Sequence, residues 1–170
     1  MASAPPDRSE LHDRGLHDRA GHDHGLQQAE IHEKATQRLR RISQRYTSGR
    51  RAIVTVMAGS DRPLTIPEIV GRDGSLATSS VYRNLATLEQ AGVVSKIVTS
   101  HDHARYELSE PFADHHHHLV CTLCGEVNDF VLPPAVEDAL DAALRKASRR
   151  SGFEPDGHRF DVTGTCTNCQ

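Results

Sequence analysis

Hydrophobic residues recur at helical spacing in several segments of the first hundred residues. Between residues 79 and 91, Val81, Leu85 and Leu88 stand at positions i, i+4 and i+7, which puts them on one face of a helix. Their side chains are therefore expected to face a core. Three further helices are predicted, over residues 28–43, where the composition is helix-forming and cationic, over residues 50–58, and over residues 65–70.

The helices predicted at 65–70 and 79–91 together indicate a helix-turn-helix. Thr65 and Glu68 have the Thr-x-x-Glu spacing of a capping box, which starts the first helix. A turn with two glycines, 71–75, separates it from the second helix, which begins with small polar residues and an arginine. In this motif the second helix enters the major groove of DNA with its N-terminal residues. For this segment taken alone, an ordinary helical hairpin remains the alternative.

Short apolar runs predict the strands. Residues 93–98 and 105–108 are expected to pair around a polar turn and to form the wing of a winged helix. Beyond them the pattern predicts a helix that opens at Pro133-Pro134 and three strands, over residues 115–121, 126–132 and 157–164.

These elements predict an α+β protein with an N-terminal winged helix-turn-helix domain and a C-terminal α/β domain. The residues before the first helix are rich in His, Asp, Gly and Arg, and they lack the apolar side chains that a core needs, so we expect them to be disordered. The predicted division is a tail over 1–27, a DNA-binding domain over 28–108, a linker over 109–114 and a metal-binding domain over 115–170.

The formal net charge of −3 conceals a strong asymmetry along the chain. Residues 34–99 carry eleven Lys and Arg against four Asp and Glu, whereas residues 100–170 carry six against twelve. A basic half joined to an acidic half rich in His and Cys is typical of a polyanion-binding module fused to a cation-binding one. With 36% hydrophobic residues and no tryptophan, a metal or a partner subunit would help to stabilise so small a core.

The sequence contains no apolar run near the roughly 20 residues that span a membrane. Residues 1–25 are polar and lack the apolar stretch of a signal peptide. We therefore expect a cytoplasmic protein without a membrane partner, in a reducing compartment where cysteines at metal spacing stay reduced.

All four cysteines belong to two Cys-x-x-Cys pairs, Cys121 with Cys124 and Cys166 with Cys169, which 41 residues separate. Each pair puts two sulfurs on one tight turn, so folding has only to join two turns to build a closed tetrahedral zinc cage, with Zn–S distances of about 2.3 Å. Two disulfides or a redox pair are the alternatives. The absence of an export signal and of a βαβ context for a redox pair favours structural zinc.

Four consecutive histidines precede the first cysteine pair. Because neighbouring side chains of a strand point to opposite faces, His116 and His118 share one face and His115 and His117 the other. The strand can thus serve two sites with nitrogen and oxygen ligands, which Fe(II), Mn(II) and Zn(II) all accept. Surface histidines without a ligand role are the alternative. The nearby side chains available to complete such sites are Glu107, Asp129, Glu137, His101 and His103.

Together these motifs resemble the ferric uptake regulator family, from about Arg45 to Cys169. The resemblance rests on Tyr46-Thr47-x-x-Arg50, on SSVYRNL at 79–85, on RYEL at 105–108, on HHHHLVCTLCGEV at 115–127, and on His158 followed by GTCTNC at 164–169. It implies a winged helix followed by a dimerisation domain. It also implies a homodimer that binds double-stranded operator DNA when a regulatory metal is present.

The resemblance also assigns site residues by position. It implies structural zinc at Cys121, Cys124, Cys166 and Cys169, a regulatory site at Glu107, His116, His118 and Asp129, and an additional site at His115, His117, Glu137 and His158. It implies DNA contacts from Tyr82 and Arg83 of the recognition helix and from the basic residue Arg45; with them we expect contacts from Arg50 and Ser79.

Two departures from the family pattern affect the regulatory site. Pro63 stands where the family often has a histidine ligand, so His101 or His103 is expected to replace it, or the site has one ligand fewer. Asp129 stands where iron sensors usually have glutamate, and it resembles the peroxide-sensing branch. The chain has no spare cysteine of the kind that some zinc-sensing members add.

The resulting prediction is a metal-responsive transcriptional repressor that controls metal homeostasis, with structural Zn²⁺ and with Fe²⁺, Zn²⁺ or Mn²⁺ as the regulatory ion. Iron is the expected ion, and a peroxide-responsive or zinc-uptake regulator is the alternative within the family. A zinc-dependent enzyme and a metal-storage module are alternatives of other classes. A four-thiolate cage leaves no open coordination position, and neither class accounts for the basic half, so we expect no catalysis and no small-molecule substrate.

Overall fold

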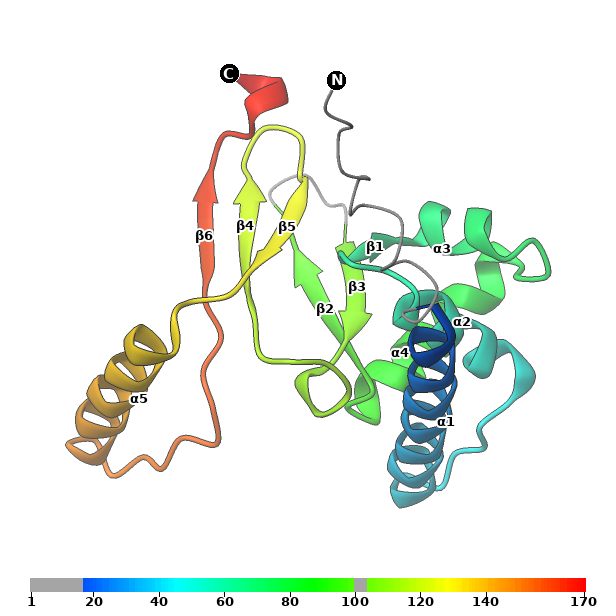
Figure 1. Ribbon diagram of the computed structural model, residues 1–170, viewed down its shortest axis with the longest axis horizontal. Coiled ribbons are helices and arrows are strands. Elements are labelled where there is room, and N and C mark those ends of the chain that lie inside the picture. Colours follow the sequence, from blue (N-terminus) through cyan, green and yellow to red (C-terminus); the bar gives the residue numbers. More distant parts are fainter. Residues whose placement is uncertain (1–16, 100–103) are drawn as a thin grey trace, which may run out of the picture.

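The computed structural model describes residues 17–99 and 104–170, of which residues 17–26 are described by their backbone alone (Figure 1). Its N-terminal half consists of helix α1 (His17–Arg41), helix α2 (Ser48–Ala58), strand β1 (Leu64–Thr65), helix α3 (Ile66–Arg72), helix α4 (Thr78–Gln90), strand β2 (Val94–Val98) and strand β3 (Ala104–Leu108). The three strands form an antiparallel sheet in the order β1-β3-β2. The predicted helix-turn-helix and wing are therefore present.

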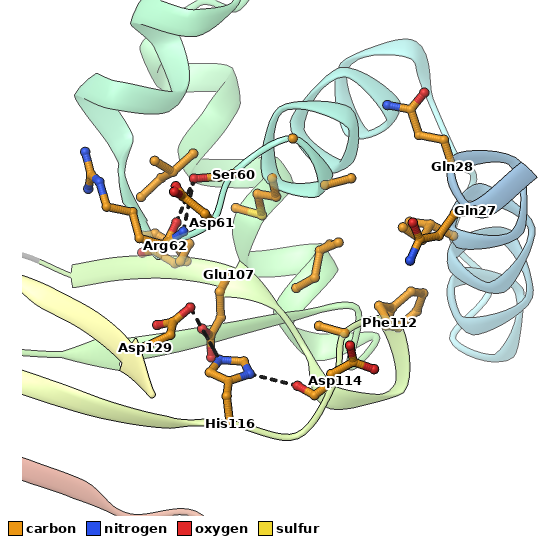
Figure 2. Close-up of a pocket in the computed structure, with 18 of the residues that line it drawn as sticks. Gln27, Gln28, Ser60, Asp61, Arg62, Glu107, Phe112, Asp114, His116 and Asp129 are labelled. Carbon is orange, nitrogen blue, oxygen red and sulfur yellow. Dashed lines mark hydrogen bonds and ion pairs between the residues drawn. The ribbon is translucent and has the colours of Figure 1, made fainter. Parts of the chain in front are cut away.

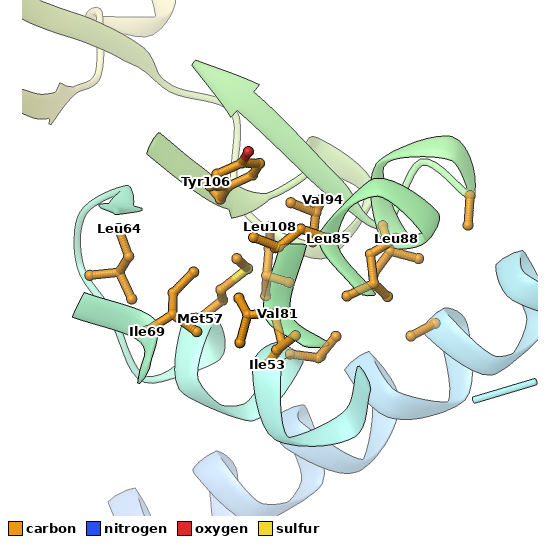
Figure 3. Close-up of a cluster of buried hydrophobic side chains, with 14 of the residues drawn as sticks. Ile53, Met57, Leu64, Ile69, Val81, Leu85, Leu88, Val94, Tyr106 and Leu108 are labelled. Carbon is orange, nitrogen blue, oxygen red and sulfur yellow. The ribbon is translucent and has the colours of Figure 1, made fainter. Parts of the chain in front are cut away.

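The core of this half lies between α2, α3, α4 and the sheet (Figure 3). The stripe predicted on α4 is buried as expected, because Val81, Leu85 and Leu88 are each at most 1% exposed. Ile53 of α2 and Ile69 of α3 are fully buried against them. This packing fixes the position of α4 and leaves its opposite face free.

Local contacts define the two helices of the helix-turn-helix. The predicted capping box of α3 is present: Glu68 N–H donates to the Thr65 hydroxyl, and the Glu68 carboxylate accepts from the Thr65 N–H. Helix α4 begins one residue earlier than expected, at Thr78, and its N-cap is Ala77 without a side-chain cap. Gly92, which has a φ of +66°, ends the helix in the left-handed conformation that glycine adopts readily.

Helix α1 begins within the segment predicted to be a disordered tail. The expected tail covers residues 1–27, but the backbone is helical from His17, while residues 1–16 lie outside the described part of the chain. Ala35 and Leu39 are fully buried and anchor the helix. Once a helix is anchored, each residue added to its end costs little free energy, and residues 26–29 are good helix formers, whereas the Gly-, His- and Asp-rich residues 17–25 are not and their helical backbone has no explanation in local propensity.

The C-terminal half consists of the 3-10 turn Glu110–Phe112, strand β4 (His117–Cys121), strand β5 (Val127–Phe130), helix α5 (Pro134–Arg149), strand β6 (Asp161–Gly164) and a last 3-10 turn, Thr167–Cys169. Its sheet has the order β5-β4-β6, with β4 and β5 antiparallel and β4 and β6 parallel. The predicted linker is itself packed, because Phe112 belongs to the core of the N-terminal half.

Figure 1 shows the two sheets beside each other, with α5 and β6 on the side away from the N-terminal helices. Strand β4 starts later than expected and β6 covers only the end of the predicted segment 157–164. None of the helices in residues 17–99 and 104–170 combines the length and apolar character needed to cross a membrane.

Candidate metal centres and DNA-reading surface

The four cysteines converge at one point, although 41 residues separate the two pairs. All four sulfurs lie within 4.8 Å of one another, and the Sγ atoms of Cys124 and Cys166 are 3.7 Å apart. Tetrahedral Zn–S bonds of about 2.3 Å place two sulfurs about 3.8 Å apart, so the spacing fits a zinc ion. The thiols are not joined in disulfides.

The backbone around Cys121 favours the thiolate form that zinc requires, whereas burial raises the pKa of Cys166 and hydrogen bonding with Cys166 and Cys124 raises the pKa of Cys169. The N–H groups of Cys166, Cys124 and Leu123 point towards Cys121 Sγ and lower the pKa of Cys121 to about 6. A donor set of four sulfurs is typical of a closed structural site, without the open position that catalysis at zinc needs.

A second cluster joins the two halves of the chain. Glu107 comes from β3 of the winged-helix half, whereas His116, His118 and Asp129 come from the C-terminal half. The Nε2 atoms of both histidines lie 3.1 Å from Glu107 Oε2. Asp129 completes the set, at 3.9 Å from His116 Nε2 and 3.8 Å from His118 Nε2. Two imidazoles and two carboxylates of this kind suit Fe(II), Mn(II) or Zn(II).

Three of the four side chains of this cluster are favoured in their charged forms, whereas burial and the nearby Glu107 raise the pKa of Asp129. Burial by itself would raise the pKa of Glu107, but its hydrogen bonds with His118 and His116 outweigh burial and lower it. Burial conversely opposes ionisation of the two histidines, and their contacts with Glu107 and Asp129 still raise their pKa. A divalent cation bound here would displace those protons, so its affinity must fall in acid.

A large cavity opens onto this cluster. It has a volume of about 1140 Å³ and extends from Gln27 on α1 to Asp129 on β5. Figure 2 shows Glu107 and His116 along its lower side, with Asp61 and Asp129 nearby. Ions in solution therefore have a path to the ligand atoms.

A third cluster forms on the other face of β4. Glu137 from α5 lies between three imidazoles: its carboxylate is 3.1 Å from His115 Nε2, 3.2 Å from His117 Nε2 and 2.8 Å from His158 Nε2. The last contact is short but lacks the direction of a hydrogen bond, so this buried Nε2 has no hydrogen-bond partner in the described structure. Three imidazole nitrogens and a carboxylate that converge on a common point in this way are suited to bind one shared cation.

The histidine rings are held from outside the clusters as well. In both clusters every Nε2 atom faces inwards, and four of the Nδ1 atoms meet an acceptor on the outer side. These contacts are His115 with Glu110 at 2.8 Å, His116 with the Asp114 carbonyl at 2.8 Å, His118 with Asp161 at 3.0 Å, and His158 with Asp141 at 3.0 Å. Such partners fix the ring and its tautomer and make the free nitrogen a better ligand.

The face of α4 opposite the core carries the predicted DNA-reading residues. Ser79 and Arg83 are exposed, and the Tyr82 side chain is 59% exposed. Arg45 is exposed in the connection between α1 and α2. Arg50 is only half-exposed. Its guanidinium donates to the Arg45 carbonyl and to the side chain of the glutamine that precedes Arg45. These contacts hold its guanidinium beside Arg45, in the connection between α1 and α2.

The structure brings together the side chains of each of the three predicted ligand sets. It does not test the two further candidate ligands of the regulatory site. His101 and His103 lie outside the described residues. Sequence reasoning missed Asp161, Asp141 and Glu110, which hold the histidine rings. The residue types gave no signal for them, since pairing between β4 and β6 decides that Asp161 stands beside His118.

Comparisons with known proteins agree with this architecture. The model of the ferric uptake regulator family matches residues 41–163. The ferric uptake regulation protein of Legionella pneumophila is 36% identical over 100 residues, which cover 59% of this chain and 67% of that protein. The peroxide-responsive repressor PerR of Staphylococcus aureus is 25% identical over 142 residues, which cover 81% of this chain and 90% of that protein.

Solved structures show the same fold. The ferric uptake regulator of Helicobacter pylori is 25% identical and superposes with a TM-score of 0.64, over 84% of this chain and 93% of that one. A zinc-bound manganese uptake regulator is 27% identical, with a TM-score of 0.54, over 80% of this chain and 98% of that one. The chain belongs to the ferric uptake regulator family.

Proposed function

We propose that the chain is a metal-responsive transcriptional repressor whose regulatory ion is held by Glu107, His116, His118 and Asp129. The observation that carries the proposal is the origin of these ligands: Glu107 lies on β3 of the winged-helix half, and the other three lie in the C-terminal half. An ion held from both sides favours one orientation of the DNA-reading domain. It acts as a switch because it binds that orientation more tightly than others.

The four-cysteine cage is proposed to hold structural zinc, and the cluster around Glu137 an additional ion. The Helicobacter pylori relative is described as having three functional metal-binding sites, which supports three sites here. The regulatory donor set accepts iron, manganese or zinc, and we propose iron. Its two carboxylates and two imidazoles lack a thiolate, which a soft-ligand zinc sensor would be expected to use.

We propose a homodimer as the active form. Strands β4 and β6 and helix α5 expose apolar side chains in the single chain, among them Leu119, Val162 and Val136, each 45% exposed or more. A second copy would cover such a surface. Two copies would present two α4 helices at a fixed separation, which suits an operator with two half-sites.

On DNA, Arg45 and Arg50 are proposed to contact phosphates, while Ser79, Tyr82 and Arg83 read base edges from the exposed face of α4. The phosphate contacts supply affinity that depends on salt, and the base contacts supply sequence preference. An Arg83 that reads guanine contributes about 1–3 kcal/mol of discrimination. The variant Arg83→Ala should therefore bind the operator more weakly by about this amount while its affinity for random DNA changes little, and equal weakening on both would show that Arg83 contacts only the backbone.

The decisive experiment compares two carboxylates that occupy equivalent places in the two histidine clusters. Operator binding is titrated with Fe(II), Mn(II) and Zn(II) on protein that retains its cysteine-bound zinc, for the wild type, Glu107→Gln and Glu137→Gln. We expect the wild type to bind about 5–150-fold more tightly with metal, the range of a typical coupling. Glu107→Gln should lose that gain, whereas Glu137→Gln should keep most of it.

Equal operator affinity of metal-loaded and metal-free wild type would overturn the proposal.

A second function within the family, peroxide sensing, is favoured by Asp129, a carboxylate shorter by one methylene than the glutamate of iron sensors. Exposure of the iron-loaded protein to peroxide, followed by mass spectrometry, tests it. Oxygen added to His116 or His118, together with loss of operator binding, would assign peroxide as the signal.

A further inference from the structure

Arg105 of β3 lies where the two halves of the chain meet. It pairs with Thr65 of β1 on one side and with Ile97 of β2 on the other, in the middle of the wing sheet. Its side chain is only 13% exposed. The guanidinium Nε donates to the Gly125 carbonyl at 2.8 Å, and Nη1 donates to the Pro63 carbonyl at 3.3 Å. One side chain thus bridges the C-terminal and N-terminal halves.

The C-terminal end of this bridge is part of the zinc hook, the turn 121–125 that carries the first cysteine pair. Gly125 follows Cys124 directly, and its backbone has a φ of +70°, which side chains rarely tolerate. A Cβ at this position would lie 2.9 Å from Thr99 Oγ1. Only glycine therefore lets the hook approach the wing this closely, and Arg105 binds the hook at the same residue.

Apolar side chains strengthen this contact. Ile97 from β2 forms a small buried cluster with Val120 and Val127 of the C-terminal sheet. The hook is consequently docked on the wing by packing, by close backbone approach and by a partly buried hydrogen bond. None of these contacts includes an atom of the regulatory cluster.

The N-terminal end of the bridge is the start of the helix-turn-helix. Arg105 Nη1 lies 3.5 Å from Glu68 Oε2, and Glu68 closes the capping box of α3. Arg62 also pairs with Glu68 and donates to the Pro63 carbonyl at 3.4 Å, and its charge interacts with that of Glu126 beside the hook, but no hydrogen bond or ion pair with the hook itself is found for it in the described structure. The two arginines therefore share Glu68 and Pro63 and differ in their contact with Gly125.

We propose that Arg105 is a positioning residue that couples the four-cysteine hook to the first helix of the helix-turn-helix. It holds the winged-helix half in the orientation that the regulatory ion then locks, so the hook contributes to DNA binding as well as to folding. The guanidinium is suited to this because its rigid fork reaches the Gly125 carbonyl and the Pro63–Glu68 pair at once, whereas a lysine ammonium is a single point of contact. The proposal rests on the proposed function only where operator affinity is concerned.

The test compares Arg105→Gln with its matched control, Arg62→Gln, in the full-length protein with cysteine-bound zinc. Small-angle X-ray scattering without DNA reports the arrangement of the two halves. We expect a larger radius of gyration for Arg105→Gln and a wild-type radius for Arg62→Gln. Operator affinity in the presence of Mn(II) should fall roughly ten-fold in Arg105→Gln, the change expected for loss of one charge-assisted hydrogen bond from the bound arrangement.

Equal radii for the two variants would overturn the proposal, because the role of Arg105 would then be confined to capping α3. If Arg105→Gln loses zinc or fails to fold, Arg105→Lys takes its place, since it retains the charge beside Glu68. It must show the same expansion, and a wild-type radius in this variant would also overturn the proposal. Operator binding by the wild type that does not depend on metal would refute the proposed function. The expected difference in radius of gyration between Arg105→Gln and Arg62→Gln would not be affected by that result.

Discussion

Helices α4 and α5 have similar apolar stripes in the sequence, and the fold uses them differently. Helix α4 buries its stripe, including Leu85, in the core of the winged-helix half. Helix α5 carries Val136, Leu140 and Leu144 at similar spacing, yet none of its residues is buried. Apart from Cys121, the buried apolar residues of the C-terminal sheet are Val120 and Val127.

The difference indicates what stabilises each half. The winged-helix half has a continuous hydrophobic core of its own, so we expect it to stay folded without a ligand. The C-terminal half has little buried apolar surface to offset its chain entropy, so we expect zinc and the proposed second copy to supply the rest. We therefore expect the half that contributes most of the metal ligands to be the half whose stability depends on the bound metal.

The largest effect is expected from opening the zinc cage. Cys124→Ser removes one of four thiolates, and structural zinc sites contribute about 10–16 kcal/mol of apparent binding free energy. The C-terminal half should unfold and the dimer should dissociate, as seen by zinc analysis and sedimentation. The control is Leu123→Ala, an exposed residue of the same hook. A dimeric Cys124→Ser protein would contradict the comparison.

A core substitution in the winged-helix half should act without regard to metal. Leu85 is 1% exposed, and Leu85→Ala is expected to lower the free energy of unfolding of this half by about 2–5 kcal/mol. Denaturant unfolding should give the same loss with and without chelator. Val98→Ala, at a residue 71% exposed, is the control and should change little. A loss that appears only after chelation would mean that zinc also stabilises this half.

Removing an outer partner of a ligand should weaken a metal site without unfolding it. Asp161 is 3.0 Å from His118 Nδ1 and orients the ring. Asp161→Asn should therefore reduce the Mn(II) affinity of the regulatory site by about 10–100-fold. Calorimetric titration measures this loss, with the exposed Asp156→Asn as control. Unchanged affinity would show that β4 alone orients the ring.

The smallest effect concerns Glu68. Burial would raise its pKa, but hydrogen bonds from Arg62 and Thr65 lower it to about 2, below an ordinary value of 4.5. The contribution of the ionised Glu68 carboxylate to folding stability is therefore fully present above about pH 4.5 and is lost as the pH falls towards about 2. Glu68→Gln should lower the stability of the winged-helix half by about 1 kcal/mol at neutral pH. The difference in free energy of unfolding between variant and wild type should become smaller below pH 4.5. A difference that stays constant with pH would refute this role of Glu68.

Much of the winged-helix half was predictable because its signals are local. The stripe Val81, Leu85 and Leu88 determines which face of α4 is buried, and the Thr65–Glu68 capping box marks the start of α3. The start of α1 was predicted wrongly at residue 28, because the propagation of an anchored helix into a polar segment depends on packing further along the chain.

The sequence by itself determined the ligand types and their division between two faces, since strand alternation separates His116 and His118 from His115 and His117. Only the tertiary structure decided which distant groups join them. The parallel pairing of β4 with β6 puts Asp161 beside His118, and the docking of the hook puts Gly125 on Arg105. Periodicity carries the geometry of one element, whereas contacts between elements follow from how all of them pack at once.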